Sequence, residues 1–151
     1  MKIFSSYYAH SEIPSTFIQV SISGGITEHI EKQVDIWDKR LAPSLDIFNE
    51  YKNSTLINKE EIYVKRFKNE ILANRNLKEI VKSWTDKHGE DKNYVILCYE
   101  VPTDFCHRHI VAEAFENEFN IKVLELNVKK DYERVNYKFK RKKSEFNNLL
   151  F

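Results

Sequence analysis

A chain of 151 residues is long enough for one hydrophobic core and short for two, and its 24 basic and 23 acidic residues nearly cancel, so composition predicts one domain and excludes no partner class. The first residues are too quickly polar for a signal peptide, and no run approaches the roughly 18 apolar residues of a membrane span, so we expect a soluble cytoplasmic protein. The two cysteines are too few for a disulfide framework and are expected to be free thiols, thiolates or ligands.

Two strands are the first elements predicted in chain order. Residues 2–8 are rich in aromatic and β-favouring side chains, and residues 17–22 are largely apolar. The second strand ends at Gly24-Gly25, which predicts a tight turn. A glycine pair can also let a phosphate approach the backbone, but no G-x-G-x-x-G or G-K-[ST] motif accompanies it here, so the plain turn is favoured.

Three helices are predicted in the middle of the chain. Ser44 is a suitable N-cap, and apolar residues spaced by three after it predict a helix that ends near residue 53. Residues 60–73 and 77–84 also carry apolar side chains at helical spacing. The aromatic residues of these segments are predicted to belong to the core rather than to a ligand cage.

A strand, a helix and a strand follow in close succession. Residues 94–99 form an almost uninterrupted apolar run, as in a strand buried on both faces of a parallel sheet. The next helix should end near Asn120, and residues 122–126 predict another strand. Such a βαβ unit is parallel and right-handed. The sequence therefore predicts an α/β fold over residues 1–126, a small doubly wound, mostly parallel sheet flanked by helices.

The chain becomes strongly basic after residue 126. We expect residues 127–151 to form a basic helical extension, because lysines and arginines outnumber acidic residues there and aromatic residues lie between them. This segment could bind nucleic-acid phosphates and stack on bases. Its candidate contacts are Lys138, Lys140, Arg141 and Lys142. A solvated helix packed against the domain is favoured over nucleic-acid binding, because a basic segment is a common surface feature.

The segment 94–112 is denser in reactive side chains than any other part of the chain. In open parallel sheets ligands bind beyond the carboxyl ends of the strands, and Cys98 and Glu100 lie at such an end. Thr103 or Asp104 is predicted to cap the following helix, whose free backbone amides would face the same crevice. The crevice is therefore expected to stabilise an anion.

Four side chains of this segment are candidates for catalysis. Cys98 or Cys106 could be a nucleophile, and Cys106 lies near a helix N-terminus and beside His107, which should depress its pKa. His107 or Glu100 could transfer protons. Inert buried thiols and a structural histidine remain open as alternatives. With His109 these residues offer enough soft ligands for zinc, but the C-x7-C-H-x-H spacing differs from zinc knuckles, so no metal is predicted and zinc is the minority alternative.

Arg108 is the best candidate for a ligand contact. It lies at the middle of an apolar helical stripe, which should direct its guanidinium over the edge of the sheet, where it could bind a phosphate or carboxylate through two hydrogen bonds. An ion pair with Glu100 is an equal alternative. Asp104 and Tyr7 complete the predicted ligand-binding group. The stripe itself consists of Val111, Ala112, Phe115 and Phe119.

The segments LCYE and FCHRHIVAE resemble the domain-of-unknown-function-488 family, in which a strand ending in C-Y-E leads to C-H-R and a helix. The likeness extends to residues 41–44 and 51–52 and to the opening residues 5–9, so it covers nearly all of residues 1–126. The resemblance implies a compact α/β domain whose site lies at the C-H-R loop. It implies no particular reaction.

One departure from the family concerns the loop after the second strand. Members that resemble this chain often carry basic residues there, whereas this chain has Ser23-Gly24-Gly25. If the loop contributes to anion binding, its share must come from backbone amides or from Lys39 and Arg40.

These features together predict a small enzyme or enzyme-like domain that binds a phosphate-bearing ligand, such as a nucleotide or a nucleic-acid end, at the Cys98–Arg108 loop. Two alternatives remain open. One is a non-catalytic nucleic-acid-binding module that uses the basic C-terminal segment, for which binding should depend strongly on salt. The other is a structural or partner-binding protein, for which both thiol pKa values should lie near about 8.5.

Overall fold

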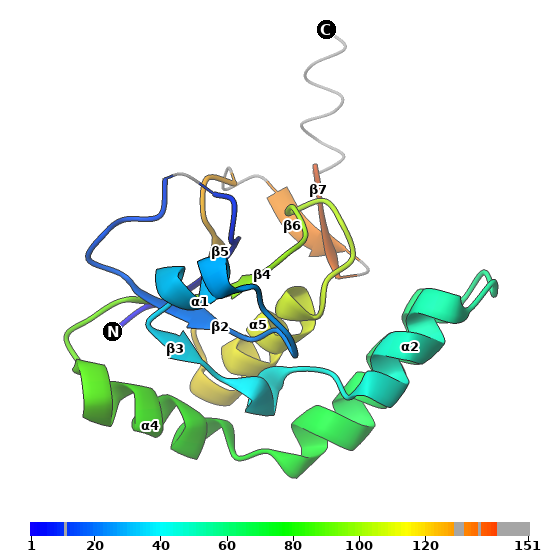
Figure 1. Cartoon of the computed structure of the whole chain (residues 1–151), viewed down its shortest axis with the longest axis horizontal. Coiled ribbons are helices and arrows are strands. Elements are labelled where there is room, and N and C mark those ends of the chain that lie inside the picture. Colours follow the sequence, from blue (N-terminus) through cyan, green and yellow to red (C-terminus); the bar gives the residue numbers. More distant parts are fainter. Residues whose placement is uncertain (11, 129–131, 136, 142–151) are drawn as a thin grey trace, which may run out of the picture.

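The computed structural model describes residues 1–10, 12–128, 132–135 and 137–141, and it confirms the α/β fold (Figure 1). Five strands form one all-parallel sheet in the order β3-β2-β4-β1-β5. The predicted strands correspond to β1, β2, β4 and β5, and β3 was not predicted. Their bounds are Ile3–Tyr7 for β1, Ile18–Ser21 for β2, Ile36–Trp37 for β3, Tyr94–Cys98 for β4 and Leu124–Glu125 for β5.

Helices lie on both faces of the sheet. The short α1 packs on one face, whereas α2 to α5 contribute to the larger core on the other. Among the described residues, no helix has the length and apolar character needed to cross a bilayer. The bounds are Glu28–Gln33 for α1, Leu45–Asn53 for α2, Lys59–Arg66 for α3, Leu77–His88 for α4 and His107–Phe119 for α5.

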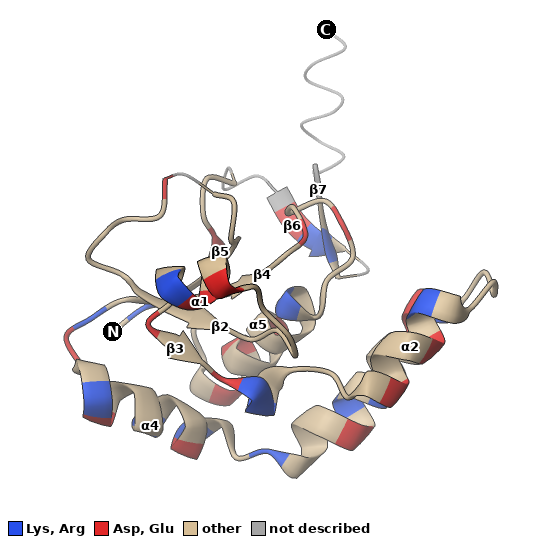
Figure 2. Cartoon of the chain, viewed as in Figure 1, with Lys and Arg blue, Asp and Glu red and all other residues tan. Residues whose placement is uncertain are grey.

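The charged residues of these helices are of mixed sign. Basic and acidic residues alternate along α4, and α2 carries acidic residues followed by a lysine in its last turn (Figure 2). Beyond its last regular turn, α3 continues through a π-helical turn at Phe67–Ile71 and a 3-10 turn at Leu72–Asn74. This agrees with the helix predicted over residues 60–73.

The central strand β4 explains where a site can form. All five of its residues are buried, and it pairs with β1 on one side and β2 on the other. Beyond the strand ends, the Tyr8 N–H donates to Cys98 O (3.1 Å) and the Ile22 N–H donates to Leu97 O (3.1 Å). The carboxyl ends of three neighbouring strands therefore meet at one edge, which is where ligands bind in parallel sheets.

Local capping signals are confirmed at the predicted helices. The Ser44 hydroxyl accepts the Ile47 N–H (3.3 Å) at the start of α2. At the end of α4, Gly89 has a φ of 110°, and a Cβ there would lie 2.6 Å from Asp91 Oδ1. Glycine is required at this position because other residues rarely adopt positive φ.

The short α1 was missed by sequence reasoning for a physical reason. Its one buried residue is Ile30, so the sequence shows no apolar periodicity. The available signal was Thr27, whose hydroxyl accepts the Ile30 N–H (3.3 Å) as the N-cap.

The predicted C-terminal helix is wrong for the described residues. β6 (Tyr132–Val135) and β7 (Lys138–Arg141) form an antiparallel hairpin, with Tyr137 at a φ of 61° in the turn. Arg134 and Phe139 are paired across the hairpin, and the Arg134 guanidinium lies 4.9 Å from the Phe139 ring. The two side chains face the domain together, so the alternation of a strand accounts for this segment better than helical spacing.

A buried carboxylate ties β3 to α4. Asp38 accepts bonds from Arg40 Nε (2.8 Å), Arg40 Nη2 (2.7 Å) and Trp84 Nε1 (2.8 Å). Burial opposes ionisation, but these donors hold the pKa of Asp38 below its usual value. The ionised carboxylate is therefore part of the native packing.

Replacing Asp38 with asparagine is expected to lower the free energy of unfolding by about 1–3 kcal/mol at neutral pH, since the charged acceptor of these bonds is lost. A depressed native pKa stabilises the fold above the unfolded value of about 3.9, and this contribution disappears as the pH falls through the native pKa. Urea unfolding of both proteins at neutral and acidic pH measures it. A difference that does not shrink in acid would contradict the assignment.

Candidate active site

A cavity of about 680 Å³ opens at the carboxyl ends of β2 and β4 and the start of α5. Backbone from the loop after β2 and side chains from α2 and α3 close its sides. The cavity is therefore built from segments far apart in the sequence. Its lining residues are Ser23, Gly24, Gly25, Lys39, Ala42, Pro43, Ser44, Leu45, Phe48, Tyr51, Tyr63, Cys98, Tyr99, Glu100, Phe105, Cys106 and His107.

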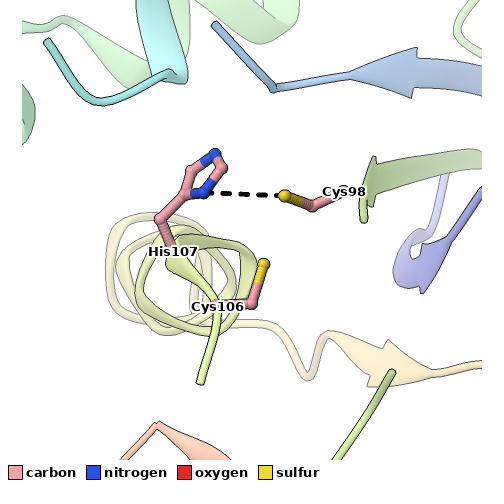
Figure 3. A group of neighbouring side chains, drawn as sticks. All are labelled: Cys98, Cys106 and His107. Carbon is pink, nitrogen blue, oxygen red and sulfur yellow. Dashed lines mark hydrogen bonds between the residues drawn. The ribbon is translucent and has the colours of Figure 1, made fainter. Parts of the chain in front are cut away.

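Cys98 lies at the end of β4 and forms the floor of the cavity. Its Sγ is 3.7 Å from Nδ1 of His107, an interaction drawn in Figure 3. The Ser23 hydroxyl donates to the same sulfur over 3.6 Å, and Glu100 Oε2 lies 3.4 Å from it. A central strand that ends at the sheet edge thus presents a thiol to three polar groups.

His107 is oriented by a backbone carbonyl. Its Nε2 lies 2.7 Å from Ile22 O, so Nε2 carries a hydrogen and donates it to this carbonyl. Nδ1 is therefore the nitrogen that faces Cys98. Phe67 packs edge-on against the imidazole with ring centroids 5.7 Å apart. The ring is fixed in the orientation that a base for the Cys98 thiol requires.

Cys106 is the N-cap of α5. Its Sγ accepts the Arg108 N–H over 3.4 Å. The predicted caps Thr103 and Asp104 are therefore wrong. The helix begins at His107, three residues after Asp104, which is exposed in the preceding loop. Asp104 does not line the cavity. The cap position places the second sulfur beside the first (Figure 3).

The two thiols differ in their electrostatics. A hydrogen bond from Cys106, opposed by burial and helped by the charge of His107, holds the pKa of Cys98 well below its ordinary value. Burial and the neighbouring Cys98 sulfur raise the pKa of Cys106 well above its own. Burial would lower the pKa of His107, but the negative Cys98 sulfur raises it overall. Of the two thiols, Cys98 is therefore the one whose charged form the site favours.

Glu100 is the carboxyl group of the site. It lines the cavity, and burial followed by the negative charge of Cys98 raises its pKa above the usual value. A carboxyl group with a raised pKa holds a proton at a higher pH than an exposed one. The structure therefore places a carboxyl group with a raised pKa 3.4 Å from the Cys98 sulfur, and its predicted role in proton transfer stays a prediction.

Arg108 lies outside the cavity, so the predicted ligand contact is wrong. Its side chain is fully buried, and Nε and Nη2 donate to Glu125 over 3.0 and 3.2 Å. Nη1 donates to the backbone carbonyl of Glu100 (2.9 Å), not to its carboxylate. The guanidinium has no surface left for a ligand anion, although the apolar stripe around it is buried as predicted.

The predicted Tyr7 does not contact the site, whereas its neighbour Tyr8 supports the lining residue Ser23. Tyr7 lies beside the His10 ring (5.3 Å between centroids) and does not line the cavity. The Tyr8 hydroxyl is hydrogen-bonded to Ser21 (2.6 Å) and Ser23 (2.7 Å), and burial raises its pKa to about 12. Tyr8 therefore positions the serine that donates to Cys98.

Aromatic rings form one wall of the cavity. Phe105 packs against Tyr51 and Tyr63 with ring centroids 5.2 and 5.1 Å apart, and Phe48 is partly exposed at the mouth. The prediction that the aromatic residues of this region belong to the core holds for Tyr63, Phe67 and Trp84, of which Tyr63 also lines the cavity. The sequence did not predict the aromatic wall of the cavity, because helical spacing alone does not indicate which residues pack against a given face of a helix.

Three side chains of the site could hold a metal ion. The sulfur atoms of Cys98 and Cys106 and one ring nitrogen of His107 lie within 4.8 Å of one another. His109, the fourth candidate from the sequence, is directed elsewhere, since its Nδ1 accepts the Nε–H of Arg134 (3.3 Å). Burial and the charge of Arg108 lower the pKa of His109 to about 2.

The basic C-terminal candidates are only partly described. Lys138 forms an ion pair with Glu60 (3.0 Å), which neutralises its charge locally. Lys142 and the side chains of Lys140 and Arg141 lie outside the described residues. Nucleic-acid binding by this segment stays a prediction.

Comparison with protein families gives a match over most of the chain. The family described as the active DUF488-N3 subclade matches residues 6–119, which include β2, β4, α5 and all residues that line the cavity. Searches among curated proteins and among solved structures gave no match. Because the match covers most of the chain, including the C-Y-E and C-H-R segments, the chain belongs to the domain-of-unknown-function-488 family.

Proposed function

We propose that the protein is an enzyme in which Cys98 is the nucleophile and His107 its base. The orientation of the imidazole supports this most directly, because Ile22 O occupies Nε2 and leaves Nδ1 facing the sulfur. In this proposal His107 Nδ1 takes the thiol proton before the attack, the Cys98 thiolate forms a bond to an electrophilic carbon of the substrate, and the proton on Nδ1 is then delivered to the leaving group. The description of the subclade as active agrees with this role.

Glu100 and Ser23 assist in this proposal. Glu100 has a raised pKa and lies 3.4 Å from the Cys98 sulfur, so it is placed to deliver a second proton to the substrate. Ser23 donates to the same sulfur, and Tyr8 holds its hydroxyl in place. Donors of this kind stabilise charge on the attacking sulfur and direct its lone pairs into the cavity.

The proposed substrate is a small molecule with a flat ring and a phosphate, such as a nucleotide. Aromatic side chains line one wall, where Phe105 is stacked on Tyr51 and lies edge-on to Tyr63, and such a wall suits a flat ring. Lys39 is the one lysine or arginine among the described residues that line the cavity. Its ammonium lies 4.0 Å from the centroid of the Trp37 ring, whose Nε1 donates to Ser23 O (2.8 Å), and in this proposal it takes the anion-binding role first assigned to Arg108.

Replacing Lys39 with methionine is expected to weaken the binding of a nucleoside monophosphate about tenfold and to leave the matching nucleoside unchanged, since only the phosphate contact is lost. Calorimetric titration of both ligands measures this. Lys32→Met is the control, because Lys32 is exposed on α1 and pairs with Glu28 (3.1 Å). Equal losses for nucleoside and nucleotide, or none for either, would contradict the phosphate contact.

A further inference from the structure

Cys98, Cys106 and His107 bring together two sulfur atoms and an imidazole nitrogen, the ligands that zinc and similar soft cations prefer. We infer that these three side chains form a binding site for a divalent cation of the zinc class, with a fourth coordination position open to the cavity. This site is distinct in chemistry from the substrate site, although the two share residues.

The distances fit this coordination. Bonds of about 2.3 Å to sulfur and about 2.0–2.1 Å to nitrogen give tetrahedral edges of about 3.6 Å between sulfur and nitrogen and about 3.8 Å between two sulfurs. Cys98 Sγ and His107 Nδ1 are already 3.7 Å apart. All three donor atoms lie within 4.8 Å of one another, so shifts of an ångström or less complete the site.

The surroundings of the three donors also match a metal site. A histidine that binds a metal through one nitrogen usually donates its other N–H to a carbonyl or carboxylate, as His107 does to Ile22 O (2.7 Å). Each sulfur accepts a hydrogen bond of the kind found around metal-bound thiolates. Ser23 supplies it to Cys98 (3.6 Å), and the Arg108 N–H supplies it to Cys106 (3.4 Å).

The charge of Arg108 is compatible with a cation here. Its Nη1 lies 3.7 Å from Cys106 Sγ, and the positive charge of the guanidinium alone would repel a metal ion bound to that sulfur. Glu125 forms a buried ion pair with the guanidinium and compensates its charge. Two thiolates then balance the two charges of the cation, so the buried cluster becomes neutral when it is occupied.

The fourth position faces the cavity, where Glu100 is the nearest further oxygen donor to the Cys98 sulfur (3.4 Å). Three protein ligands with an open position are typical of exchangeable or catalytic zinc sites rather than closed structural ones. When the cation binds, the thiol protons leave to solvent and the sulfur lone pairs are engaged. The bound cation would therefore inhibit the nucleophilic reaction of Cys98, a consequence that rests on the proposed function.

Cobalt(II) titration of the full-length, chelator-treated protein tests the site. We expect one equivalent to bind with a sulfur-to-cobalt charge-transfer band and the visible absorption of four-coordinate cobalt, and zinc to abolish both. Cys106→Ala should weaken binding at least about 100-fold, because one of three ligands is removed. His29→Ala, which removes an exposed histidine on α1, should bind as the wild type does.

Zinc protection of the wild-type protein provides a second test that needs no variant. Zinc should suppress iodoacetamide labelling of Cys98 and Cys106, and a chelator should restore it. A wild-type protein without the charge-transfer band, Cys106→Ala binding as tightly as wild type, or unprotected cysteines would each overturn the inference. The cobalt spectrum does not depend on which thiol is nucleophilic, so failure of the proposed function would leave the band intact.

Discussion

Replacing His107 with glutamine is expected to slow the alkylation of Cys98 by iodoacetamide about 100-fold in metal-free protein, the low end of what a positioned base contributes. Glutamine can still donate to Ile22 O, but it cannot accept the thiol proton that Nδ1 accepts in the wild type. The rate of incorporation at neutral pH, followed by mass spectrometry of the Cys98 peptide, measures the effect.

His109→Gln is the matched control for this experiment. His109 is on the same helix and is also buried, but its Nδ1 accepts a hydrogen bond from Arg134 rather than facing a thiol. Alkylation of Cys98 should stay within about twofold of the wild-type rate in this variant. Similar rates in all three proteins would show that the imidazole of His107 does not activate the sulfur.

Replacing Glu125 with alanine is expected to lower the free energy of unfolding by about 3–5 kcal/mol. Glu125 is the carboxylate of a fully buried ion pair with Arg108, and it also accepts the Ser5 hydroxyl (2.8 Å). Without it, the guanidinium stays buried with the Glu100 carbonyl as its closest remaining oxygen (2.9 Å). An uncompensated buried charge costs far more than an exposed one, and urea unfolding measures the difference.

Asp86→Ala provides the comparison for the buried pair. Asp86 pairs with Lys82 on the surface of α4 at 2.6 Å, with both side chains more than half exposed. The change in unfolding free energy should stay below about 1 kcal/mol. In the double variant Arg108→Met, Glu125→Leu, which removes both charges, we expect much of the lost stability to return. Equal losses for Glu125→Ala and Asp86→Ala would contradict the structural role of the buried pair.

The parallel sheet could be predicted because its signals are local. The apolar run of β4 and the stripe of α5 are continuous in sequence, and both are buried as expected. The hairpin of β6 and β7 could not be read in the same way. The sequence of the hairpin is short and basic. Its only strand-like feature is the alternation of side chains that places Arg134 and Phe139 on the same face.

The four predicted catalytic side chains line one cavity, whereas the three predicted ligand contacts, Arg108, Asp104 and Tyr7, do not. The sequence predicted a ligand contact for Arg108 because it does not reveal the true partner, Glu125. That residue lies seventeen positions away on a strand of two residues at the sheet edge, and no local pattern indicates the ion pair. Tyr7 and Tyr8 are neighbours in sequence but point to different surroundings at the end of β1. Which residues contact a ligand is decided by distances in the folded protein, and these distances cannot be read from the spacing of residues along the chain.

The zinc alternative was set aside in the sequence because of its ligand spacing. Spacing rules of that kind describe ligands carried on one short loop. Here Cys98 ends a strand and Cys106 and His107 begin a helix, so the loop between them sets only the length of the connection. The βα junction, rather than a knuckle, brings the three donors together.

The partition of a limiting amount of iodoacetamide between the two thiols tests the central claim most directly. Native, metal-free protein is labelled for a short time, unfolded and mapped by peptide mass. If Cys98 is the nucleophile, it should carry at least about ten times more label than Cys106, because its charged form is stabilised and that of its neighbour is not. Equal labelling of both cysteines, or preferential labelling of Cys106, would contradict the assignment of Cys98.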